Sequence, residues 1–131
     1  MIDRELDIQT PDGAMNTFVT HPEEGGPHPV VLFYMDAPGK RGELHDMARR
    51  LGTAGYFVVL PNLYYRRVRD FRKGTGVDAL GIMFEHMNSL DRTKVLTDTA
   101  AMMKFAANHP AARSDKIGVV GYCMSGPFVL W

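Results

Sequence analysis

The chain has 131 residues, 45% of them hydrophobic and 23% charged, as is typical of one soluble globular domain. Basic and acidic residues each number 15, so the zero net charge argues against nucleic-acid and membrane-surface partners. The single cysteine excludes an internal disulfide, and the charged start MIDRELD is unlike a signal peptide. We therefore expect one cytoplasmic domain over residues 1–131, with no metal and no other cofactor.

The first predicted element is a β-hairpin. Residues 4–9 and 15–20 flank the turn tripeptide Pro11-Asp12-Gly13. Proline presets the backbone angle that such a turn needs, and glycine accepts a positive φ. We expect this hairpin to lie at the edge of a sheet.

A buried strand, a helix and a second buried strand are predicted next. Residues 30–34 (VVLFY) and 56–60 (YFVVL) are continuous apolar runs, typical of parallel strands covered on both faces. Between them, residues 41–54 are expected to form a helix that Gly55 ends. Its apolar positions have helical spacing: Leu44, Met47, Ala48 and Leu51.

The stretch from residue 66 to residue 94 is hard to assign to an element. It opens with RRVRDFRK, which forms the basic loop 66–73. One interpretation is a solvated loop rich in arginine. The other is that Arg66, Arg67, Arg69 or Arg72 binds a carboxylate of a substrate, for which a guanidinium is well suited.

A helix over residues 91–108, a buried strand over 117–120 and a further helix from Ser125 complete the chain. Alternating strands and helices predict an open, mostly parallel sheet with helices on both faces. In such sheets ligands bind beyond the carboxyl ends of the strands. Two segments meet that rule, MDAPG at 35–39 and GYCMSG at 121–126.

Three glycine-rich motifs compete for residues 118–126. A phosphate-binding loop is excluded because Pro127 stands where its lysine should be, and the GxGxxG pattern of a dinucleotide site is absent. A nucleophile elbow requires small residues two positions before and after the nucleophile. Gly121 and Ser125 meet that requirement around Cys123, so the elbow fits best.

The elbow would place Cys123 at a strand-to-helix turn, where free backbone N–H groups favour a thiolate. The backbone N–H groups of Met124 and Ala37 would then form the oxyanion hole. Two alternatives remain open: Cys123 is a small buried hydrophobic residue, or Ser125 is the nucleophile.

The strings GYCMSG after IGVV, VVLFYMDAPGKR and LGTAGYFVVLPNLYYR resemble the dienelactone hydrolase (carboxymethylenebutenolidase) family of α/β-hydrolases. The resemblance covers roughly residues 28–65 and 95–131. It implies that Cys123 is the nucleophile and that Asp36 stands where the family usually has a glutamate contacting the resting thiol. It also makes Arg66 a candidate for substrate binding.

The sequence after Cys123 offers no acid and no histidine to complete a catalytic triad, which in α/β-hydrolases follow the nucleophile. We therefore expect the 131 residues to be the N-terminal part of a longer protein and inactive alone. We expect His21, His28 and His109 to be solvated. We expect His45 to lie on the polar side of the helix over residues 41–54, and His86 to be able to approach the site.

Together these observations predict a three-layer α/β-hydrolase sheet, mostly parallel with an N-terminal hairpin and truncated after the nucleophile elbow. The expected function is opening of a small lactone or ester through a cysteinyl acyl-enzyme. The alternative is a non-catalytic truncated α/β module that associates with itself through an exposed sheet edge.

Overall fold

The computed structural model describes residues 1–35, 41–68 and 79–121. The backbone there forms five strands and three helices. In chain order they are β1 (Ile2–Thr10), β2 (Gly13–His21), β3 (His28–Tyr34), α1 (Gly42–Thr53), β4 (Phe57–Pro61), α2 (Ala79–Asn88), α3 (Arg92–Ala107) and β5 (Ala112–Gly121).

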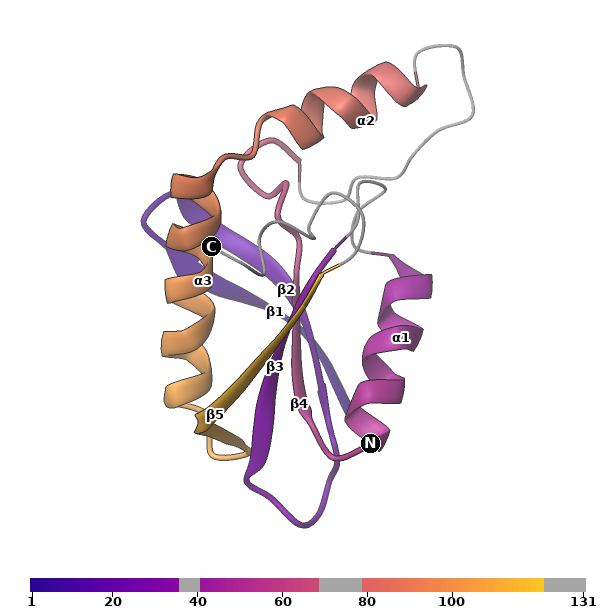
Figure 1. Cartoon of the computed structure of the whole chain (residues 1–131), viewed down its shortest axis with the longest axis vertical. Helices are drawn as coiled ribbons and strands as arrows, with labels where there is room; N and C mark the ends of the chain where they lie inside the picture. The colour runs from indigo at the N-terminus through magenta and orange to yellow at the C-terminus, as the bar shows by residue number, and fades with distance from the viewer. Residues whose placement is uncertain (36–40, 69–78, 122–131) are drawn as a thin grey trace.

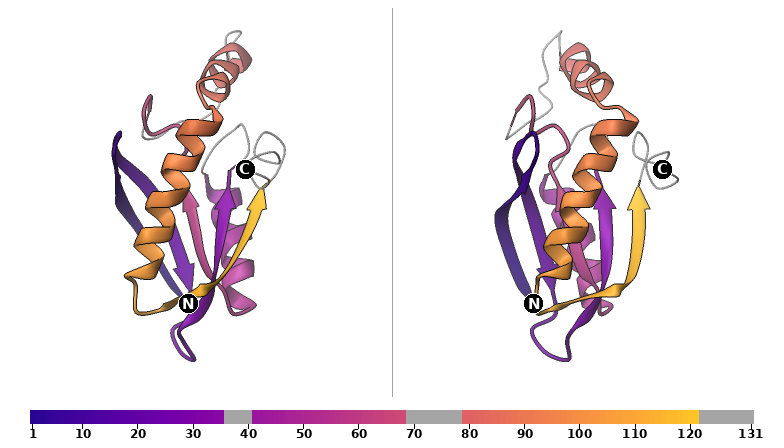
Figure 2. Two further views of the ribbon diagram at one scale, coloured as in Figure 1. Left: turned by 60° about the vertical axis from the view of Figure 1, so that its left-hand side comes forward. Right: turned by 90° about the vertical axis from the view of Figure 1, so that its left-hand side faces the viewer.

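The strands form one sheet in the order β1-β2-β4-β3-β5. β1 pairs antiparallel with β2, and β2 pairs antiparallel with β4. β3 runs parallel to both β4 and β5, so three neighbouring strands point the same way. α1 covers one face of the sheet and α3 covers the other, which gives three layers (Figures 1 and 2). The predicted three-layer α/β fold with an N-terminal hairpin is confirmed, and its sheet is mixed, with parallel pairing among β4, β3 and β5 and antiparallel pairing at β1 and β2.

The hairpin turn is built as the sequence indicates. Gly13 has a φ of +134°, and the hydroxyl of Thr10 donates a hydrogen bond of 3.0 Å to its carbonyl oxygen. The amide of Asp12 in turn donates to the Thr10 hydroxyl at 3.0 Å. β1 lies at one end of the strand order, so the predicted edge position of the hairpin is also confirmed.

Both long helices end close to their predicted limits. Gly55 has a φ of +106° and its amide donates to the carbonyl oxygen of Gly52, which is the glycine stop expected for α1. α3 begins after Asp91, whose carboxylate accepts a hydrogen bond of 2.8 Å from the amide of Lys94. No helix in the described ranges is long and apolar enough to cross a membrane.

α2 is the element that the sequence did not predict. It lies inside the stretch 66–94, and it carries apolar residues on more than one face. Ile82 and Phe84 are exposed, whereas Met83 between them is buried. Because exposed apolar residues surround the buried ones, no single apolar stripe marked this helix in the sequence.

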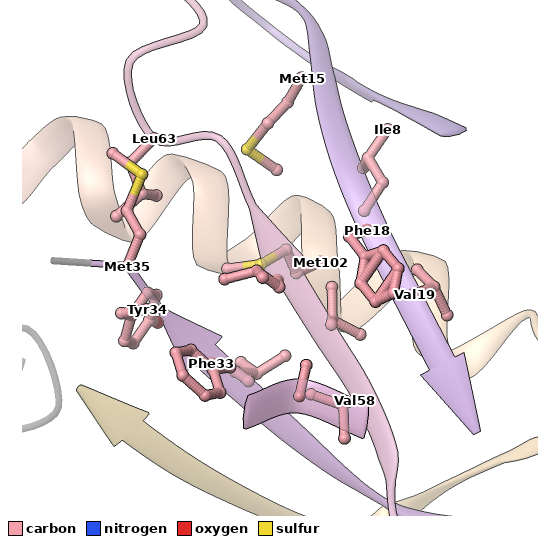
Figure 3. Close-up of a cluster of buried hydrophobic side chains, with 14 of the residues drawn as sticks. Ile8, Met15, Phe18, Val19, Phe33, Tyr34, Met35, Val58, Leu63 and Met102 are labelled. Carbon is pink, nitrogen blue, oxygen red and sulfur yellow. The ribbon is translucent and has the colours of Figure 1, made fainter. Parts of the chain in front are cut away.

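The core fills the space on both faces of the central strands. Every residue of β4 is buried, and β3 is buried at all positions except Pro29. Figure 3 shows part of this cluster, with Phe33 and Tyr34 of β3 and Met102 of α3 among its labelled side chains. Burial on both faces explains why these strands are continuous apolar runs.

Candidate functional site

The carboxyl ends of β3 and β5 lie side by side. The two strands are parallel and in register up to their last residues, so that Tyr34 is paired with Gly121. The segments that were predicted to carry the chemistry follow directly from these two strand ends. The predicted residues themselves lie outside the described ranges: Asp36, Ala37, Cys123 and Met124.

The end of β3 is held against α3. Tyr34 and Met35 are almost fully buried, and the Tyr34 hydroxyl is hydrogen-bonded to the hydroxyl of Thr99 on α3. Burial raises the pKa of the Tyr34 phenol, although the bond to Thr99 acts against that rise. This contact fixes the strand immediately before the segment that contains Asp36 and Ala37.

The turn after β4 is organised by one buried amide side chain. Asn62 donates hydrogen bonds of 2.9 Å to the side chain of Asn16 and to the carbonyl oxygen of Val68. Its own amide oxygen accepts a bond of 3.0 Å from the backbone N–H of Tyr64. Because Asn62 is bonded at both ends of the segment, residues 62–68 close into a compact turn at the carboxyl end of the sheet.

Arg66, the candidate for substrate binding, is bonded within the protein. Two of its nitrogens donate to the Asp98 carboxylate on α3 at 3.0 and 2.9 Å, and its Nε donates to Asp12 at 2.8 Å. The guanidinium also lies over the ring of Tyr65, 4.7 Å from its centre. Arg66 therefore joins the turn after β4 to the hairpin and to α3.

Asp98 is the centre of this network and was not singled out from the sequence. Its side chain is 0% exposed, and it also accepts a hydrogen bond of 2.7 Å from the Tyr65 hydroxyl. Burial raises the pKa of Asp98 against the effect of its Arg66 and Tyr65 partners, and burial raises the pKa of Tyr65 to about 12. The available sequence signal was an aspartate on the core side of α3, between Val95 and Met102.

A second polar cluster connects the same turn to α2. The Nε of Arg67 donates to Nδ1 of His86 at 3.1 Å, and one Nη lies 2.9 Å from the Glu85 carboxylate. The His86 ring stacks on Tyr64 with 5.4 Å between ring centres. Burial, together with the positive charge of Arg67, lowers the pKa of His86, and Glu85 opposes that change.

The prediction of solvated histidines was wrong for His21 and His28, which are buried. His21 stacks on Phe57 at 5.1 Å and meets His109 edge-on at 5.7 Å. Burial and then the nearby His21 lower the pKa of His109, which itself packs on Phe57 and Phe105. The loop composition suggested exposure, but Phe57 at the start of β4 covers the His21 ring.

His86 belongs to the last turn of α2, the helix beyond the carboxyl end of the sheet (Figure 1). His21 ends β2 and His28 begins β3, at the opposite end of the sheet, whereas His45 of α1 stacks on Phe18. Because Arg67 can only donate, Nδ1 of His86 must accept, and the neutral ring then carries its proton on Nε2. In this tautomer Nε2 carries the proton, so that nitrogen can donate a hydrogen bond but cannot act as a general base.

In the described ranges, no three histidine, cysteine, aspartate or glutamate side chains are grouped so as to hold a metal ion. The candidate site thus consists of three parts. They are the adjoining carboxyl ends of β3 and β5, the turn over residues 62–68 that Asn62 and Arg66 hold in place, and α2 next to that turn.

Comparison with solved structures agrees with the predicted α/β-hydrolase type of fold. A protein of Klebsiella pneumoniae described as a dienelactone hydrolase has a crystal structure that superposes with a TM-score of 0.81 at 24% identity. The superposition covers 93% of this chain and 50% of that protein, and it establishes the shared fold.

The sequence comparisons identify the family. Residues 15–131 match the dienelactone hydrolase family, and the chain belongs to that family. A Methylorubrum extorquens protein named as a carboxymethylenebutenolidase is 30% identical over 96% of this chain and 42% of its own length. A Bradyrhizobium protein named as a 2-oxo-3-(5-oxofuran-2-ylidene)propanoate lactonase is 26% identical over 95% of this chain and 48% of its own. The chain thus spans about half the length of these relatives.

Proposed function

We propose that this chain carries the nucleophile of a hydrolase that opens a small lactone or ester. The register of β3 with β5 carries this proposal, because it brings the starts of MDAPG and GYCMSG to neighbouring strand ends. A nucleophile and the donors of an oxyanion hole require that juxtaposition. Family membership and the names of the relatives support the substrate class.

In the proposed reaction the Cys123 thiolate attacks the carbonyl carbon of the lactone or ester. A carbon–sulfur bond forms, and the oxyanion is stabilised by the backbone N–H groups of Met124 and Ala37. The carbonyl then re-forms, the carbon–oxygen bond of the ring or ester breaks, and the leaving oxygen takes up a proton. Water hydrolyses the thioester and restores the thiol. Asp36 is assigned to tuning the thiol in the resting state.

The substrate is proposed to carry a carboxylate, for which Arg66 is the candidate partner. Its guanidinium is 15% exposed and is bonded to Asp98 and Asp12. Asp98 is fully buried, whereas Asp12 is 47% exposed on the hairpin turn. A substrate carboxylate would therefore have to replace Asp12 and not Asp98.

The test is acylation of the single cysteine by an activated ester such as p-nitrophenyl acetate. We expect release of about one equivalent of p-nitrophenol per chain, with the matching mass increase on Cys123 and slow deacylation. Cys123→Ala should abolish both signals, and Ser125→Ala is the matched control that should retain them. Equal product release by Cys123→Ala would refute Cys123 as the nucleophile.

A second candidate function is self-association through the sheet edge at β5. Among the described strands, β5 pairs with β3 alone and ends the strand order. An unpaired strand edge is a template for pairing with another chain. This function predicts a dimer in analytical ultracentrifugation and a Cys123 thiol that alkylates at an ordinary rate. A monomer over a wide concentration range would contradict it.

A further inference from the structure

α2 lies beyond the carboxyl ends of the parallel strands, at the same end of the molecule as the candidate site (Figures 1 and 2). It has 10 residues, too few for a helix to be stable in water by itself. Met83 is buried, but Ile82 and Phe84 on the same helix are exposed. Met83 and Met87 pack on the hydrophobic core, and polar contacts join the helix to the turn after β4.

The described contacts with the turn after β4 centre on His86 and its neighbour Glu85. Arg67 donates to its Nδ1 at 3.1 Å and pairs with the neighbouring Glu85 at 2.9 Å. The Tyr64 ring, which is almost fully buried, stacks on the imidazole at an interplanar angle of 28°. Both Tyr64 and Arg67 belong to the turn that Asn62 closes, so α2 is attached to a rigid part of the fold.

The bond between Arg67 and His86 exists only while the imidazole is neutral. A neutral ring can accept at Nδ1, whereas an imidazolium ion carries hydrogen on both nitrogens and has no acceptor. Protonation would set two donors and two positive charges against each other at 3.1 Å. Glu85 is the described carboxylate next to this pair, but its side chain is 65% exposed, so solvent screens its compensating charge.

We propose that α2 is an acid-released cap at the carboxyl end of the sheet, with the hydrogen bond from Arg67 to His86 as its latch. Near neutral pH the latch is closed and α2 packs on the turn after β4. Protonation of His86 opens it and exposes the end of the sheet where the candidate site lies. The latch does not depend on Cys123 being a nucleophile, and its test is independent of the acylation test.

The lowered pKa of His86 is consistent with this geometry, because burial and the charge of Arg67 both favour the neutral ring. Release of α2 is therefore expected at a pH below about 6.5, the usual pKa of a histidine side chain. At neutral pH the closed form is the stable one.

Hydrogen exchange of the full chain, read by mass spectrometry and corrected for the pH dependence of intrinsic exchange, tests the proposal. Between about pH 7.5 and pH 5, protection of α2 peptides should fall by about tenfold, the effect of losing one hydrogen bond to a charged group. Peptides from α1 and β3 should keep their protection. No change in α2, or an equal loss throughout the chain, would overturn the proposal.

Two variants and a control sharpen the test. His86→Asn offers a carbonyl oxygen near the position of Nδ1 but does not titrate, so the acid response of α2 should disappear. Arg67→Met removes the latch itself, so protection of α2 should already be low at pH 7.5 and should change little on acidification. His45→Asn removes a histidine of α1 and should leave the α2 response unchanged. An acid response retained in full by a folded His86→Asn protein would refute the latch.

Discussion

Replacing Asp98 by alanine should destabilise the fold strongly. The substitution removes a fully buried carboxylate and leaves the Arg66 guanidinium, 15% exposed, without its two shortest contacts to α3. Breaking a buried ion pair from one side costs about 3–5 kcal/mol. Arg66 would keep Asp12 at 2.8 Å, so we expect a loss near the lower end, about 3 kcal/mol. For a domain whose whole stability is roughly 5–15 kcal/mol, that is a large fraction.

Urea denaturation followed by circular dichroism measures this loss as a lower midpoint at unchanged slope. Asp98→Asn keeps one acceptor and should fall between the wild type and Asp98→Ala. The informative control is the double variant Asp98→Leu with Arg66→Met, which removes both charges and should recover much of the stability. A loss below about 0.5 kcal/mol for Asp98→Ala would refute the view that this pair holds α3 to the turn after β4.

Three further outcomes follow from individual contacts. Because the pKa of His109 is lowered in the folded state, the unfolded chain takes up the proton first as the pH falls. The free energy of unfolding should therefore decrease below about pH 6.5, and His109→Asn should flatten this dependence in urea titrations at several pH values. Gly55→Ala should cost about 1–2 kcal/mol from its φ of +106° alone, since the added methyl group meets no atom within 4 Å; an unchanged melting temperature would contradict this. Tyr34→Phe should cost about 1 kcal/mol by calorimetry, and Thr99→Val should cost nearly as much if their hydroxyls are true partners.

The sheet could be predicted because its signals are local and chemically simple. β3 and β4 are buried on both faces, so their apolar runs identify them without any knowledge of the neighbours. Gly13 and Gly55 mark backbone angles that other residues adopt at a cost. The sequence indicated the class of sheet but not the order of its strands, because register and crossover direction depend on contacts between distant segments.

The polar residues could not be placed from the sequence because each is defined by distant partners. Arg66 meets Asp98 across 32 positions and Asp12 across 54, so an arginine-rich string does not show which guanidinium is buried. His21 and His28 flank a loop rich in proline and glycine, yet aromatic rings at the start of β4 and the end of α3 enclose His21. Cys123 and Asp36 lie outside the described residues, and their assignment still rests on spacing and family membership.

The string PNLYYRR illustrates how a motif that resembles an active-site signature also has a structural explanation. Asn62 closes the turn, Tyr64 packs under α2, and Tyr65 bonds to the buried carboxylate of α3. Arg66 faces the hairpin and α3, whereas Arg67 faces α2. Successive side chains thus fix three different elements around one strand end. The end of β4 lies beside β3, the strand that precedes the proposed oxyanion donor. A rigid turn there supports the geometry that the proposed reaction requires, because a nucleophile and its oxyanion donors must keep their relative position.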